Sequence, residues 1–484
     1  MGLWEKFWTH EFKGDDLSEF AKPSLREHVA NYITEAFSQS LFYYVVLTFS
    51  TYFYTDVIGL PAAAVGMVVL VSRLLDGVSD MLAGYLMDKT DSPYGRSRVW
   101  FFWTSIPYAI SMALLYYVPH TSTAGQMLYV WVTYNFATTI SYTLSNMSWN
   151  AITTFTTRNQ KERDKLFSLR VGASNLGGAV ASAIVLPLVA MAGGIYNQTS
   201  WKIVVTIFAV ICYVLNIAGV FCMKERMKAD KTSRENSSLD LPCTLKNPYF
   251  WCSIAVVGFY NVFQVATMTF MPYYAQYILG DTMLTSRILP IQSGLICATC
   301  FLVAWLQNKG VKKKTLVIVG SLIAIPGQLV FAMFPTNLPV IYVSTLLRGF
   351  GFGFTGACMF AFVGEAIEYG HWRFGHRAES TVSVANGIGN KLGVTIGAGL
   401  TTVMLGAVGY DGTLEMQPES ALQLIRIVFI WAPVFFAILL IITMLLNKMN
   451  KMYDVIMSDL AAGRYHPKAE YAPAQAERSQ AVKN

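Results

Sequence analysis

Two carboxylates lie one helical turn apart inside a long apolar stretch of the sequence, at Asp76 and Asp80. The spacing i, i+4 places both on one face of a helix, where two bare negative charges repel each other. A carboxylate at membrane depth costs about 3 kcal/mol even on the lenient insertion scale, so such residues usually mark an ion or substrate path. A cation or a proton between the two aspartates removes the repulsion. The pair therefore predicts a cation-coupled transporter.

The composition of the chain is that of a polytopic membrane protein. Its 484 residues are 54% hydrophobic and 13% charged, whereas about 25% of residues are charged in a typical soluble protein. Apolar segments of about 20 residues or more recur along nearly the whole length. They predict twelve transmembrane helices, roughly at 31–54, 62–87, 99–118, 125–150, 168–191, 201–223, 249–277, 284–306, 315–334, 338–363, 381–408 and 422–447.

The loops between these segments predict the orientation of the chain in the membrane. Every second loop carries several Lys and Arg residues, whereas the loops between them, such as 119–124 and 409–420, carry none. The positive-inside rule then places both termini in the cytoplasm, as for a multi-pass protein of a bacterial inner membrane. The same bias accounts for the net charge of +7, so that charge gives no reason to expect nucleic-acid binding.

The longest hydrophilic break falls after six predicted spans and divides the chain. It is expected to be a cytoplasmic linker over 224–247, between six-helix halves at 29–223 and 248–449. The predicted fold is all-α, the major-facilitator layout, in which two halves surround a site near the bilayer midplane. Residues 1–28 are expected in the cytoplasm as an interfacial helix or a loose tail. Residues 450–484 form a cytoplasmic tail whose composition predicts disorder.

Motifs for other kinds of chemistry are missing from the sequence. It contains no nucleotide-binding loop, no metal-ligand cluster and no nucleophile elbow. Secondary rather than ATP-driven transport is therefore expected, without an enzymatic activity, a cofactor or a bound metal beyond the coupling cation.

Three stretches, in register over about residues 30–447, resemble the glycoside–pentoside–hexuronide:cation symporters, the melibiose permease group. They are 52–60, 73–98 with its aspartate pair and Tyr-Gly-Arg-Ser-Arg ending, and 368–380. The resemblance implies import of a small sugar, coupled to Na⁺ or H⁺, by a monomer embedded in membrane lipid.

By this resemblance, Asp76 and Asp80 are the carboxylates of the cation site. Thr143 stands at the position of a hydroxyl that can help to coordinate sodium, and Asn146 stands where a relative has an aspartate. Oxygen ligands suit a hard cation such as Na⁺. The alternative is a structural role in which the aspartates pair with a basic residue such as Arg73 and only lock helices together.

The resemblance also implies a sugar site, in which Trp149 matches an aromatic position and Arg170 a substrate-site arginine. The alternatives are ordinary packing for Trp149, an interfacial position for Arg170, and snorkelling to the surface for Lys391. The full set of expected substrate residues is Glu35, Gln39, Ser40, Asn146, Trp149, Arg170 and Lys391.

Ser40 and Asn146 replace two sugar-binding aspartates of the melibiose permease. Because Arg170 and Lys391 are kept, the site is expected to be more positive. Guanidinium groups bind carboxylate and sulfonate with charge-assisted hydrogen bonds. The sequence therefore favours an acidic sugar, such as a hexuronide, a glucuronide or a sulfonated sugar. A neutral pentoside or glycoside, or a lysolipid as in distant relatives, is the alternative.

A further group of charged residues is expected at the cytoplasmic side, where it either closes an inner gate or forms a solvated basic loop. The group consists of Arg73, Asp88, Arg96, Arg98, Glu368 and Arg377.

Overall fold

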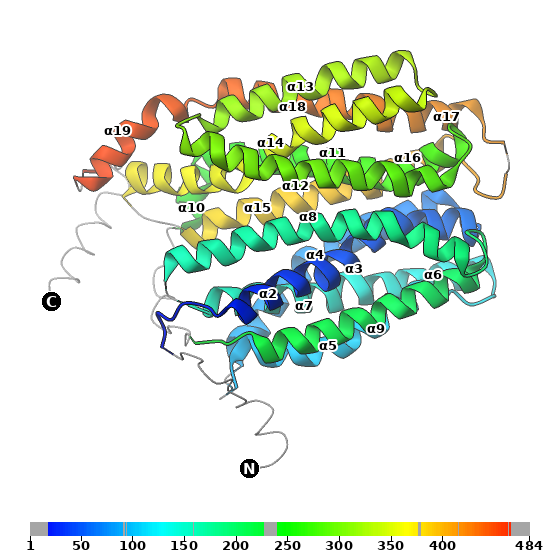
Figure 1. The fold of residues 1–484 in the computed structure, drawn as a ribbon, viewed down its shortest axis with the longest axis horizontal. Coiled ribbons are helices and arrows are strands. Elements are labelled where there is room, and N and C mark those ends of the chain that lie inside the picture. Colours follow the sequence, from blue (N-terminus) through cyan, green and yellow to red (C-terminus); the bar gives the residue numbers. More distant parts are fainter. Residues whose placement is uncertain are drawn as a thin grey trace, which may run out of the picture. The chain divides into compact units, whose positions relative to one another are not determined.

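Helices make up all of the regular structure in the computed structural model, which describes residues 18–90, 92, 94–157, 159–226, 240–375, 379–414, 416–462 and 464–465. Twelve long helical rods follow one another in this part of the chain (Figure 1). Each rod overlaps one of the twelve predicted apolar segments, and the predicted all-α fold is confirmed. The rods form because apolar runs of this length satisfy every backbone hydrogen bond internally.

The first six rods run from Leu25 to Cys222. The first is composite, with α2 (Leu25–Thr34), η1 (Glu35–Ser40), α3 (Leu41–Val45), η2 (Val46–Ser50) and η3 (Phe53–Val57). The others are α4 (Ala62–Lys89), α5 (Arg96–Leu114), α6 (Thr123–Asn135) with η4 (Phe136–Tyr142) and α7 (Thr143–Phe155), α8 (Gln160–Met191) and α9 (Gln198–Cys222).

The last six rods lie between two short helices, α10 (Asp240–Leu245) and α19 (Met449–Ala461). They are α11 (Pro248–Tyr277), η6 (Thr282–Leu284) with α12 (Thr285–Asn308), α13 (Lys313–Met333), α14 (Leu338–Phe374), α15 (Glu379–Val394) with η7 (Thr395–Leu400) and α16 (Thr401–Ala407), and α17 (Glu419–Arg426) with η8 (Ile427–Trp431) and α18 (Ala432–Leu446).

Eight of the rods are long and apolar enough to cross a membrane by length and composition alone. The other four are the first, third, fourth and eleventh, of which the fourth and the eleventh are the richest of the twelve in hydroxyl, amide and glycine residues. Three of these four carry the sugar-site residues expected from the sequence, apart from Arg170. Lower hydropathy is physically reasonable there, because a helix that lines a polar pathway presents less of its surface to lipid.

Short π-helical segments interrupt the rods that carry candidate site residues. The first rod contains η1, η2 and η3, and the fourth contains η4. A π-turn closes its hydrogen bond from residue i+5 to residue i, is rare, and often occurs at functional sites. Each turn changes which side chains share a face with those of the preceding α-helix.

Packing divides the chain into two compact units. The first consists of Met1–Ala229, Val265–Cys297 and Thr395–Phe429, and the second of Asp230–Gln264, Ala298–Val394 and Ile430–Asn484. α11 contributes its beginning to the second unit and its end to the first.

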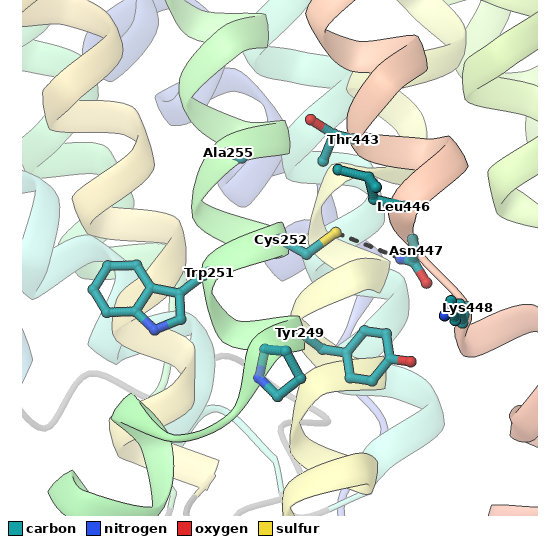
Figure 2. Close-up of a pocket in the computed structure, with 9 residues that line it drawn as sticks. Tyr249, Trp251, Cys252, Ala255, Thr443, Leu446, Asn447 and Lys448 are labelled. Atoms are coloured by element: carbon teal, nitrogen blue, oxygen red, sulfur yellow. Dashed lines mark hydrogen bonds between the residues drawn. The ribbon is translucent and has the colours of Figure 1, made fainter.

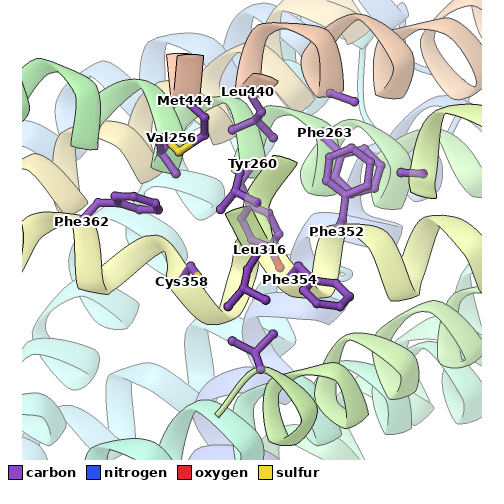
Figure 3. Packing of buried hydrophobic residues seen from close by; sticks show 14 residues of the cluster. Val256, Tyr260, Phe263, Leu316, Phe352, Phe354, Cys358, Phe362, Leu440 and Met444 are labelled. Carbon is purple, nitrogen blue, oxygen red and sulfur yellow. The ribbon is translucent and has the colours of Figure 1, made fainter. Parts of the chain in front are cut away.

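The core of the second unit is aromatic and tightly packed (Figure 3). Phe263 of α11 stacks on Phe352 of α14, with the ring centroids 3.6 Å apart. α13 and α14 approach closely where Gly320 faces Gly351, since a Cβ on either glycine would collide with the carbonyl oxygen of the other. The hydrophobic effect contributes little to helix association in lipid. Small residues at such crossings instead allow close packing of the two backbones.

In the first unit, a partly buried carboxylate joins the end of the first rod to two other segments. Asp56 accepts hydrogen bonds from the hydroxyls of Tyr277 and Tyr410, both at 2.7 Å, and from Thr55 at 2.6 Å. Tyr52 adds a 2.6 Å bond to Gln276 nearby. These contacts hold the end of α11 and the segment after α16 against the first rod.

Candidate cation and sugar site

Asp76 is held by two side chains in the middle of α4. It is only 5% exposed. Its Oδ1 accepts a hydrogen bond of 2.6 Å from the hydroxyl of Thr139, and its Oδ2 forms a 2.9 Å ion pair with Nη1 of Arg73. Arg73 also donates to the hydroxyl of Tyr134 at 3.3 Å. The guanidinium of Arg73 therefore lies where a coupling ion would neutralise the Asp76 carboxylate.

The sequence pointed to Thr143 as the hydroxyl of this site, but the structure brings Thr139 to Asp76. Thr143 lies four residues later, and its hydroxyl donates to the carbonyl of Thr138 at 3.2 Å. The difference arises in η4, whose π-turn ends immediately before Thr143. Thr143 was expected from the resemblance alone, and its part in binding the cation stays a prediction.

We expect Thr139→Val to raise the cation concentration for half-maximal sugar uptake by about tenfold. The reason is that a hydrogen bond to a charged group contributes about 1.5–3 kcal/mol, and 1.4 kcal/mol corresponds to a factor of ten. Thr143→Val is the matched control and should change this concentration less than about threefold. Equal effects of the two variants would show that Thr139 has no special role.

Asp80 lies one turn further along α4 and is partly buried. The helical spacing keeps it on the Asp76 face. Its part in binding the cation stays a prediction.

A second charged cluster joins the first rod to α8. Nε of Arg170 donates to Oε2 of Glu35 at 2.6 Å, and both side chains are less than 10% exposed. Oε1 of Glu35 accepts a hydrogen bond from Ser40 at 3.2 Å, and Ser40 is hydrogen-bonded to Ser174 at 2.8 Å. Among the described residues, the buried Nη1 of Arg170 has no hydrogen-bond partner. The structure thus brings three of the expected sugar-site residues together.

The π-turn η1 accounts for the contact between Glu35 and Ser40. In an α-helix two residues five apart are rotated by about 140° and face different directions. η1 runs from Glu35 to Ser40, and the i+5 bond of a π-turn brings these ends onto one side. A carboxylate therefore reaches position 40 although the residue there is a serine.

Two stacked tyrosines lie between the two charged clusters. The rings of Tyr43 and Tyr142 are 5.8 Å apart and tilted by only 24°. Both rings are partly exposed. Tyr43 lies near Arg73 and Asp76, and Tyr142 lies near Glu35 and Arg170. The stacked pair thus lies between the expected cation site and the expected sugar site.

Trp149 lies in the packed core of the first unit. It is fully buried and its ring stacks on Phe101 with the centroids 4.9 Å apart. Gly219 of α9 approaches the same ring so closely that a Cβ would lie 3.1 Å from it. Because protein atoms cover this ring, Tyr142 is the better placed aromatic surface. Sugar stacking by Trp149 stays a prediction from the resemblance alone.

Gln39 joins three rods rather than the charged cluster. Its amide donates to Ser145 at 3.0 Å and to Asn216 at 3.3 Å, and Ser38 donates to Asn216 at 2.7 Å. Gln39 is completely buried. Interhelical hydrogen bonds of this kind fix how helices pack in a membrane.

Asn146 is partly exposed on α7, and its amide lies 3.5 Å from the hydroxyl of Tyr142. This places Asn146 beside the stacked tyrosines. Its role toward cation or sugar stays a prediction.

Lys391 belongs to the second unit, on α15. Gly389 and Gly393 allow α11 to approach this helix, since a Cβ on them would collide with Val257 and Asn261 respectively. Lys391 lies midway between the two glycines, and two residues rotate an α-helix by about 200°. The lysine is therefore on the side of α15 that faces away from α11.

Comparisons over the whole chain show its family. Residues 32–451 match the model of a family described as MFS/sugar transport protein. The chain belongs to this family. Its curated relatives include the isoprimeverose transporter of Lactiplantibacillus pentosus, 29% identical over 89% of this chain and 90% of the relative. The glucuronide carrier protein homolog of Escherichia coli is 26% identical over 76% of this chain and 80% of the relative.

Among solved structures, the transporter resembles a bacterial homolog of the human lysosomal transporter Spinster in an inward-facing, unoccupied conformation. The TM-score is 0.64 and the identity 14%, over 91% of this chain and 98% of that chain. At this identity the likeness shows the fold, which is the predicted major-facilitator fold. Together with the relatives it confirms the predicted resemblance to glycoside–pentoside–hexuronide:cation symporters, a group of transporters and not of enzymes.

Two of the arginines expected at the inner gate of the transporter make other contacts. Arg98 is buried and donates to the carbonyl of Val220, near the end of α9, at 2.9 Å. In return, the carboxylate of Glu225 accepts from the backbone N–H groups of Ser97 and Arg98 at the start of α5. Opposite charges thus complement two helix ends. Arg96 lies over the ring of Phe155, 5.5 Å from its centroid.

Of the other residues expected at the inner gate, the structure describes only some. Arg73 pairs with Asp76 rather than with a loop residue. Glu368 is partly buried on α14. Arg377 and the side chain of Asp88 lie outside the described residues.

An open cavity of about 470 Å³ lies elsewhere in the transporter, in the second unit (Figure 2). It is found where α11 begins and α18 ends, and a 3.5 Å hydrogen bond from Asn447 to the Cys252 sulfur crosses it. None of the candidate site residues lines it. Its lining consists of Pro248, Tyr249, Trp251, Cys252, Ala255, Thr443, Leu446, Asn447 and Lys448.

Proposed function

We propose that this membrane protein imports a sugar by symport with Na⁺ or H⁺. The observation that carries the proposal is the buried carboxylate of Asp76, which meets a hydroxyl on one side and a guanidinium on the other. A carboxylate at this depth needs a positive charge. Oxygen atoms of Asp76 and Thr139 suit Na⁺, and protonation of the same carboxylate would serve H⁺ coupling.

The ion pair suggests how the cation acts. A coupling cation at Asp76 competes with Arg73, so that its binding releases the guanidinium from the carboxylate. Arg73 also donates to Tyr134 and lies near Tyr43, and Tyr43 stacks on Tyr142. Binding of the ion can therefore change the sugar site through these side chains. By linkage, the sugar must raise the affinity for the ion by the same factor.

Two classes of sugar are compatible with the family. Isoprimeverose is uncharged and a glucuronide carries a carboxylate, so the relatives' names point to both classes. The acidic class was expected because Arg170 and Lys391 are positive and Ser40 and Asn146 are neutral. That expectation holds only if no acidic residue neutralises the positive charge of Arg170. A lysolipid is the less favoured alternative, because the names of the relatives point to sugars.

The transport cycle follows from the fold. Major-facilitator proteins alternate access to a central site by rocking one half against the other. The positive-inside distribution supports a cytoplasmic position for both termini in a bacterial inner membrane. We propose that a single chain performs the cycle.

The test is uptake by proteoliposomes that contain the purified protein. An inward Na⁺ gradient, an inward H⁺ gradient and no gradient are compared for radiolabelled sugars of both classes. We expect one gradient to raise internal sugar above the external concentration. If no sugar accumulates with either gradient, while a known symporter prepared in parallel is active, the proposed function is wrong.

A further inference from the structure

We infer that Glu35 makes this transporter selective for uncharged sugars, because it provides the acceptor carboxylate of the sugar site and neutralises Arg170. The inference rests on the proposed function and names the substrate class of its site. It replaces the acidic class that the sequence alone favoured.

The first argument is the charge of the cluster. Glu35 and Arg170 form a buried ion pair of 2.6 Å, so the cluster carries no net charge. The hydroxyls of Ser40 and Ser174 complete it without adding charge. Arg170 therefore does not offer an uncompensated positive charge to a substrate. The positive site expected from the sequence is not formed at this place.

The second argument concerns the hydrogen-bonding groups that remain. Nη1 of Arg170 has no hydrogen-bond partner among the described residues, and the whole residue is only 7% exposed. An orphaned buried donor of this kind usually has a ligand or water to satisfy it. The Glu35 carboxylate beside it has lone pairs beyond those used by Arg170 and Ser40. Adjacent donor and acceptor groups suit the hydroxyls of a sugar, each of which both donates and accepts.

The third argument explains why an anion is disfavoured. A substrate carboxylate that approached Nη1 of Arg170 would also approach Glu35, and the two negative charges would repel. If the substrate instead displaced Glu35, a buried carboxylate would lose its counter-ion, which is strongly unfavourable. An uncharged sugar incurs neither cost. The partly exposed side chains of Tyr43 and Tyr142 add uncharged surface nearby.

The experiment compares sugars that differ only in charge. Methyl β-D-glucoside is paired with methyl β-D-glucuronide, the corresponding galactosides form a second pair, and methyl β-D-xyloside is added. Binding to the purified protein is measured by thermal stabilisation in the presence of Na⁺ and at low pH without Na⁺. We expect the wild-type protein to bind the uncharged member of at least one pair at least tenfold more tightly.

Glu35→Gln tests the residue itself. It leaves Arg170 without its counter-ion, so the ratio of acidic to uncharged binding should rise at least 100-fold, and the acidic sugar should restore thermal stability to this variant. Glu27→Gln is the matched control, because Glu27 lies in the same rod as Glu35 and forms a buried ion pair of 2.7 Å with Arg226, which follows α9. It should lower stability without changing the preference.

The outcomes separate this inference from the proposed function. Preference of the wild-type protein for the acidic members overturns the inference and leaves sugar symport intact. An unchanged preference in a folded Glu35→Gln variant overturns it as well. Failure of every sugar to bind or accumulate overturns the proposed function and the inference with it. The wild-type comparison needs no variant, so it decides the question even if Glu35→Gln does not fold.

Discussion

Asp76→Asn is expected to abolish cation-driven accumulation, so that internal sugar does not exceed the external concentration in proteoliposomes. The amide keeps the shape of the side chain but removes the charge that a cation or a proton neutralises. Without that charge, the ion does not bind one state of the transporter more tightly than another. Coupling between the ion and the sugar then disappears. Equilibration of sugar down its own gradient should persist. The measurement is uptake with and without a cation gradient.

The control for this variant is a measurement of folding, because Asp76→Asn also removes the counter-ion of Arg73. The double variant Asp76→Asn with Arg73→Gln restores neutrality and should regain thermal stability without regaining accumulation. Asp80→Asn is expected to lose accumulation as well. Continued cation-dependent accumulation by the Asp76→Asn variant would show that this carboxylate is not the coupling site.

Arg170→Gln is expected to lower stability by about 3–5 kcal/mol, the usual effect of removing one member of a buried ion pair. The Glu35 carboxylate is then buried without its guanidinium. The double variant Glu35→Gln with Arg170→Gln should regain most of this stability, because no charge is left uncompensated. It should not regain sugar binding, since the acceptor carboxylate and the donor are both gone. Unfolding of the purified variants and sugar-induced stabilisation give the two readouts.

The buried pair of Glu27 and Arg226 is the comparison for this double-variant cycle. Its 2.7 Å contact and low exposure match those of the Glu35 pair. Both pairs should therefore show similar coupling in stability, but only the Glu35 pair should affect sugar binding. Loss of sugar binding in both cycles would mean that the Glu35 pair is structural only.

Much of this architecture was predictable from the sequence. Twelve apolar stretches and the alternation of basic loops predict the rods and their order, because apolar length and charge are local properties of the chain. Asp76 and Asp80 could also be selected in advance, since a charge inside an apolar segment is conspicuous without any knowledge of neighbouring helices.

The sequence was less informative about which side chains meet. By resemblance it pointed to Thr143, and the structure adds Thr139 as the hydroxyl that donates to Asp76. For Trp149 it left sugar stacking and ordinary packing open, and the ring packs against Phe101. Contacts of this kind depend on residues far away in the chain, which no local pattern reveals.

The charge of the expected sugar site shows most clearly what the sequence determined and what only the tertiary structure decided. The sequence determined that a carboxylate is missing at Ser40 and that Arg170 is present. Only the tertiary structure decided that Glu35 takes the missing position, because the π-turn η1 rotates it toward Ser40 and the packing of α8 brings Arg170 to it. Residue types and hydropathy are written in the sequence, but a local change of helical period and the partner across a helix interface are set by packing.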